Sequence, residues 1–75
     1  MKNVYLVSRE NVGDNEYVVA ANEKAAQRQM LHWVKARRAI FDVPVDITDE
    51  EALRDWYEFT GCNEYITYEV MPVIS

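Results

Sequence analysis

A proline near the middle of the chain limits what this sequence can fold into. Pro44 has no backbone N–H to donate and disfavours helical geometry at the residue before it, so no helix runs through it. Before it, apolar residues recur at helical spacing over residues 23–39, with Asn22 placed to cap the first turn. After it, Thr48 and Glu51 have the spacing of a capping box. The sequence therefore predicts two helices, one on each side of this break.

Residues typical of β-strands lie on both sides of the helical region. Residues 4–7 and 17–20 are β-branched or aromatic and flank a segment rich in Asn and Gly, residues 11–15. They predict a hairpin whose loop is longer than two residues. The alternating segment 64–71 predicts a third strand. Its residues expected on one face are Ile66, Tyr68 and Val70.

These elements give the order ββααβ in a single domain spanning residues 1–75. A chain of this size buries only about 60% of the surface that it exposes when unfolded, so it has room for one core. We expect an α+β fold in which a helical hairpin covers one face of a three-stranded sheet. If the chain reverses its direction after each strand and helix, the third strand runs parallel to the first. It can pair beside either of the other two.

Charge is divided unevenly along the chain. Residues 1–41 carry seven basic and four acidic side chains, whereas residues 42–75 carry nine acidic ones and only Arg54 as a base, for a net charge of −5. This balance argues against general affinity for nucleic-acid backbones, which rests on clustered Lys and Arg. We expect an acidic surface that binds a protein with a basic surface. Its predicted members are Asp49, Glu50, Glu51, Asp55, Glu58, Glu64 and Glu69.

The same charges are also compatible with roles other than protein binding. Acidic runs are commonly solvated helix faces, and basic residues near a helix C-terminus interact favourably with the helix dipole. One alternative function is binding of a small ligand or nucleic acid through the basic face of the first helix, formed by Arg28, Lys35, Arg37 and Arg38. Arg37 is unusual there, because helical spacing places it within the apolar stripe beside Trp33.

A second alternative is a homodimeric structural or regulatory module. An exposed strand edge or a tyrosine-rich sheet face would form its interface. The tyrosines expected on strands are Tyr5, Tyr17, Tyr65 and Tyr68.

The sequence contains few residues suited to catalysis or metal binding. His32 and Cys62 are the single histidine and the single cysteine, too few for a structural zinc site. The acids around Asp46 lack the spacing of a calcium-binding EF-hand loop. We predict no catalytic residue, no metal and no cofactor, and therefore not an enzyme. The single cysteine and the lack of a long apolar run predict a cytoplasmic protein without membrane insertion.

The N-terminal third resembles a group of small proteins. Residues 1–8, followed by a short turn, residues 17–21 and residues 22–26, resemble the start of many small accessory proteins carried by bacteriophages and mobile elements, some anti-CRISPR proteins among them. The resemblance transfers no functional residue. It implies a phage-encoded, anti-defence inhibitor of a host factor, whose target is a nucleic-acid-binding host protein.

Overall fold

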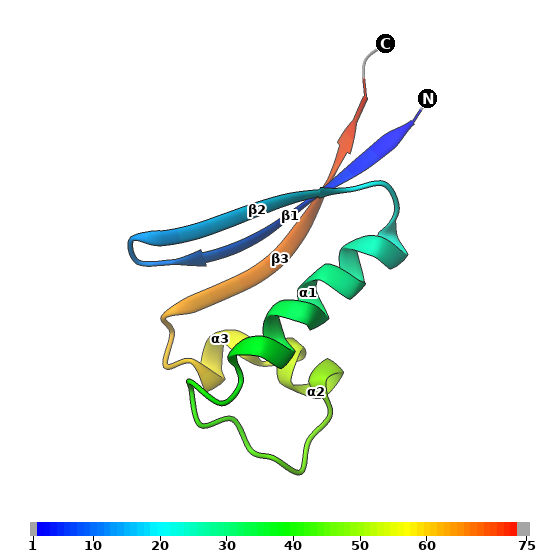
Figure 1. Ribbon diagram of the computed structural model, residues 1–75. Coiled ribbons are helices and arrows are strands. Elements are labelled where there is room, and N and C mark those ends of the chain that lie inside the picture. Colours follow the sequence, from blue (N-terminus) through cyan, green and yellow to red (C-terminus); the bar gives the residue numbers. More distant parts are fainter. Residues whose placement is uncertain (1, 74–75) are drawn as a thin grey trace.

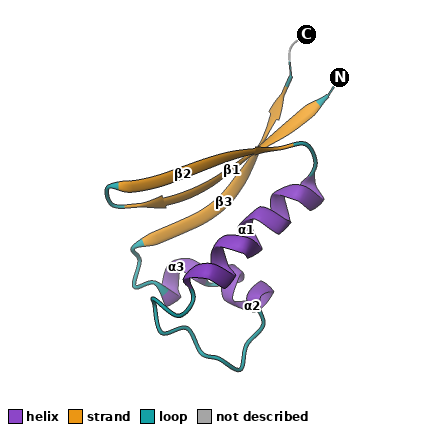
Figure 2. Ribbon diagram, in the orientation of Figure 1, coloured by secondary structure: helices purple, strands orange, loops and turns teal. Residues whose placement is uncertain are grey.

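The computed structural model describes residues 2–73 and has an α+β fold, as expected (Figure 1). A three-stranded antiparallel sheet carries helices on one of its faces (Figure 2). Helix α1 lies along the sheet, and two short helices, α2 and α3, lie near its C-terminal end. The elements in chain order are β1 (Asn3–Asn11), β2 (Asp14–Ala20), α1 (Glu23–Arg37), α2 (Asp49–Arg54), α3 (Trp56–Phe59) and β3 (Glu64–Pro72).

The hairpin between β1 and β2 is tighter than the sequence predicted. Asn11 pairs with Asp14, so the loop contains only Val12 and Gly13, and the expectation of a longer loop was wrong. Gly13 has a φ of 77°, a conformation that glycine adopts without strain. The side chain of Asn15 accepts a hydrogen bond of 3.1 Å from the Asn11 N–H. The polar residues that suggested a long loop therefore belong to the paired strands.

The third strand pairs with β1 and runs antiparallel to it, in the sheet order β2-β1-β3. Val7, at the centre of β1, is paired with Val18 of β2 on one side and with Tyr68 of β3 on the other. The expectation of a parallel third strand was therefore wrong. The connection at residues 38–48 runs back from the end of α1 to the start of α2 (Figure 1). It reverses the direction of the chain once more, and a count of helices and strands alone does not include this reversal.

Both predicted helix caps are present. The side chain of Asn22 accepts from the Ala25 N–H at 2.8 Å at the start of α1. At the start of α2, Thr48 accepts from the Glu51 N–H, and Glu51 accepts in return from the Thr48 N–H, each at 3.1 Å. The second predicted helix is broken at Asp55 into α2 and α3.

Each face of the sheet has a different environment. Because side chains alternate along a strand, residues with odd numbers in β1 and their partners in β2 and β3 face the helices. The buried core lies on that side, in two clusters that meet between α1 and α2. The first contains Val7, Ala20, Ala26, Met30 and Trp33, and the second contains Val34, Val43, Ala52 and Trp56.

No helix of residues 2–73 lies along the opposite face of the sheet (Figure 2); α3 reaches it only at the start of β3, where Tyr57 contacts Tyr65 with ring centroids 5.7 Å apart. We call this face the open sheet face. Its residues are Val4, Leu6, Ser8 and Glu10 from β1, Asn15, Tyr17 and Val19 from β2, and Tyr65, Thr67, Glu69 and Met71 from β3.

Candidate functional site

Glu64, which the sequence predicted on an acidic surface, is completely buried at 0% exposure. Its Oε1 accepts from Arg9 Nη1 at 2.8 Å and from Asn11 Nδ2 at 3.3 Å, and lies 2.7 Å from Arg37 Nη2 in an ion pair. Its Oε2 accepts from Arg37 Nε and from Trp56 Nε1, both at 2.9 Å. Glu64 is therefore not part of a partner-binding surface, and its assignment to one was wrong.

The environment of Glu64 keeps its carboxylate ionised. Burial by itself raises the pKa of this group, because a charge is less stable away from water. Hydrogen bonds from Arg37, Trp56, Arg9 and Asn11 outweigh burial and lower the pKa of Glu64 below its ordinary value. Since four hydrogen bonds and a further ion-pair contact already engage its two oxygens, the carboxylate has no free position for a substrate proton. The arrangement is that of a structural ion cluster.

The predicted basic patch does not form a continuous surface. Arg37, the last residue of α1, turns inward to Glu64, with a side chain that is only 22% exposed. Arg38 bonds to Asp49 Oδ1 at 2.8 Å and to the Ile47 carbonyl at 3.0 Å, and so holds the 38–48 connection against α2. Two of the four predicted basic residues therefore have internal partners. The two that remain exposed are Arg28 and Lys35.

The position of Arg37 was the one sequence signal for the buried cluster. A cation within an apolar helical stripe requires a nearby acid if it turns inward. Arg9 gave no such signal, although its side chain is only 2% exposed and also pairs with Glu16 and Asp14. Glu64 also gave no signal of burial, because an acidic residue at the start of an alternating strand can equally well be exposed to water.

Four of the predicted acids are exposed in the segment that contains α2 and α3, and we call them the acidic helical face. It consists of Glu50, Glu51, Asp55 and Glu58. Within residues 2–73, none of these four makes an ion pair. Asp49 is neutralised by Arg38, and Glu69 is exposed but lies on the open sheet face. The acidic helical face therefore contains four of the seven acids that the sequence assigned to the partner-binding surface.

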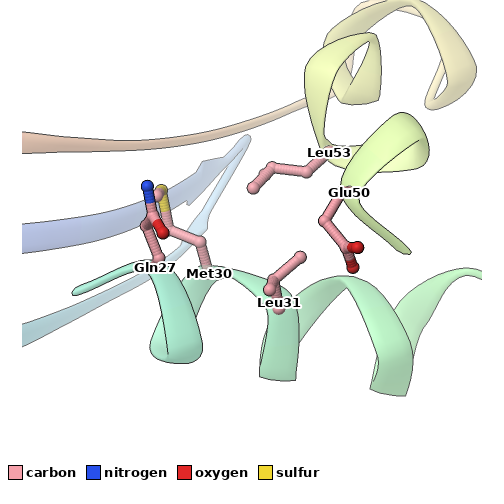
Figure 3. A pocket seen from close by; sticks show the side chains of 5 residues that line it. All are labelled: Gln27, Met30, Leu31, Glu50 and Leu53. Atoms are coloured by element: carbon pink, nitrogen blue, oxygen red, sulfur yellow. The ribbon is translucent and has the colours of Figure 1, made fainter. Parts of the chain in front are cut away.

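A hollow of about 210 Å³ lies between α1 and α2, at the border of the acidic helical face (Figure 3). Its lining is mainly apolar: Figure 3 shows Leu53 reaching from α2 toward Met30 on α1, with Leu31 alongside. Gln27 and Glu50 supply its polar groups. Pockets for drug-sized ligands have volumes of about 300–1,000 Å³, so this hollow fits a single side chain better than a cofactor.

The four tyrosines of the strands divide equally between the two faces of the sheet. Tyr5 and Tyr68 face the helices and contact each other, with ring centroids 5.6 Å apart. Tyr17 and Tyr65 lie on the open sheet face and are 56% and 52% exposed. On the same face Val19 is 66% and Met71 42% exposed. The open sheet face therefore presents apolar and aromatic side chains to water, next to polar residues of the same face.

Comparison with known proteins gives no relative for this arrangement. No protein-family model, curated protein or solved structure matches the chain. The resemblance to phage accessory proteins stays a prediction. Among residues 2–73, no helix combines the length and the apolar character needed to cross a bilayer, and no cluster of three His, Cys, Asp or Glu side chains is placed to hold a metal ion.

Proposed function

We propose that the protein is a non-enzymatic binding module that recognises a basic, partly aliphatic segment of a partner protein. The recognition surface is the acidic helical face together with the hollow between α1 and α2. The observation that carries this proposal is the position of Glu50, which belongs to both features. A basic nucleic-acid-binding groove of a host protein is one surface with the required chemistry.

The hollow distinguishes a binding surface from one that only keeps the chain dissolved. Solubility explains exposed carboxylates, but it does not require an apolar depression beside one of them. Arg and Lys carry an aliphatic stem that packs on apolar surface and a cationic end that seeks a carboxylate. Such a side chain would place its stem on Met30, Leu31 and Leu53 and its charge at Glu50.

The remaining acids would attract and orient the same partner. Asp55 and Glu58 are exposed, and Arg54 is the single basic residue of α2 and α3. A surface of one sign raises the association rate with partners of opposite sign and disfavours others. Because exposed charges are screened by salt, binding is expected to weaken as ionic strength rises.

Selection from a library of random peptides tests this proposal and does not require the natural partner. Immobilised protein is expected to enrich peptides that combine Arg or Lys with aliphatic residues. A variant in which the acidic helical face is neutralised (Glu50→Gln, Asp55→Asn, Glu58→Gln) is expected to lose these peptides. The matched control removes the same number of charges from exposed positions outside the acidic helical face and the open sheet face: Glu23→Gln, Asp42→Asn and Asp46→Asn.

Two results would overturn the proposal. One is enrichment of peptides without basic residues, or no enrichment at all. The other is equal loss of binding in the control variant, which would assign the effect to net charge instead of this site. Glu51 is left unchanged in both variants because it belongs to the capping box of α2.

A further inference from the structure

The open sheet face carries apolar side chains where a sheet face in contact with water usually carries polar ones. Val19, Tyr17, Tyr65 and Met71 are between 42% and 66% exposed, and Leu6 lies among them at the centre of β1. Met71, Val19 and Tyr17 occupy successive rows of this face, and exposed apolar surface of this kind on a small protein marks an interaction site. It lies on the opposite side of the sheet from the helices, so this inference is independent of the proposed function.

The charged residues of this face are arranged toward its ends and one edge. Lys2, one residue before β1 and in alternation with Val4, lies at one end, and Glu10 lies at the other end of the same strand. Between them the central row contains Leu6 and Val19. Glu69 occupies the same row, but on the edge strand β3, where its carboxylate is exposed to water.

We propose that a second copy of this chain covers the open sheet face, with the two sheets packed face to face. A two-fold axis that lies between the sheets and crosses the strands reverses strand direction. It places Lys2 of each copy opposite Glu10 of the other and brings the Leu6 rows together, and at the water-exposed edge of these rows Glu69 of one copy lies beside Glu69 of the other. The acidic helical faces point outward on both sides, so the four exposed acids of each chain stay away from this interface.

Sedimentation equilibrium of wild-type and variant protein, from about 10 µM to about 1 mM chain, tests this proposal. We expect a monomer–dimer equilibrium for the wild type. Val19→Lys places a charge at the centre of the interface and is expected to raise the dissociation constant at least about tenfold. Val45→Lys is the matched control, because Val45 is also apolar, is 96% exposed and lies in the 38–48 connection.

A monomeric wild type at every concentration would overturn the proposal, as would a dimer that Val19→Lys leaves intact. Backbone amide chemical shifts of the wild type give a second test that needs no substitution. On raising the concentration, shifts are expected for Leu6, Val19 and Met71 and not for residues of α2. Shifts confined to the helices would contradict this interface.

Discussion

Among single residues, one buried acid does most to hold the molecule together. Glu64 joins β3 to β1 through Arg9, to α1 through Arg37 and to α3 through Trp56. Two arginines neutralise one carboxylate there, and exposed acids at Glu16 and Asp14 balance the second positive charge through Arg9. Because every buried charge in the cluster is paired, the desolvation of each is offset by its neighbours.

Removing the charge of Glu64 is expected to destabilise the fold strongly. In Glu64→Gln, Arg37 loses its acidic partner and the cluster keeps an uncompensated cation, which typically costs about 3 kcal/mol or more of unfolding free energy. Urea denaturation measures this loss. The control is Glu69→Gln, an exposed acid of the same strand, where a change within about 0.5 kcal/mol is expected. Equal effects in both variants would contradict the structural role of Glu64.

The same residue sets part of the pH dependence of stability. Because the folded protein lowers the pKa of Glu64 below its ordinary value of 4.5, protonation favours the unfolded chain. Its contribution is fully present above that value and is lost as the pH falls through the lower folded pKa. Glu51, whose pKa is lowered mainly by the Thr48 N–H, acts in the same direction. The slope of unfolding free energy below about pH 4.5 should therefore decrease, but not vanish, in Glu64→Gln.

Among the helices and strands, α2 depends most on its N-terminal cap. It has only six residues, too few to be stable through its own hydrogen bonds. Thr48→Ala removes the acceptor of the Glu51 N–H and is expected to cost about 1 kcal/mol in urea denaturation. Thr48→Ser keeps the hydroxyl and should retain most of the stability. If alanine and serine had the same effect, the capping box would not contribute to stability.

The sequence predicted the features that depend on near neighbours. The caps at Asn22 and Thr48 each need only residues three positions away, so local spacing was sufficient to find them. The direction of β3 depended on the path of the 38–48 connection, which no local pattern encodes. The break between α2 and α3 likewise coincides with a tertiary contact, because Trp56, directly after it, is buried against Glu64.

The candidate site could likewise be predicted only where a residue's exposure depends on its near neighbours in the chain. Glu51, Asp55 and Glu58 were expected to be exposed from helical spacing, and they are. Glu64 and Arg37 were expected on surfaces, but each found its partner across 27 positions of the chain. Long-range pairing of this kind leaves no trace in a single sequence beyond a cation placed within an apolar stripe. The hollow also required the structure, because residues of two helices form it.

Across the molecule as a whole, the two candidate interaction surfaces lie on opposite sides. The helices carry the acidic helical face, and the open sheet face is turned away from them (Figure 2). A dimer formed through the sheets would present two acidic helical faces outward. A partner with two basic segments would then bind with higher avidity than either site provides alone.

The proposed function depends above all on a contact between Glu50 and a basic side chain of the partner, which a double-mutant cycle measures. One of the enriched peptides is titrated calorimetrically against wild-type protein and Glu50→Gln, with its arginine present or replaced by citrulline, which has the same shape and no charge. We predict that the two changes are not additive, with a coupling of about 0.5 kcal/mol or more. Fully additive losses would show that Glu50 does not contact the cation and would contradict the proposed function.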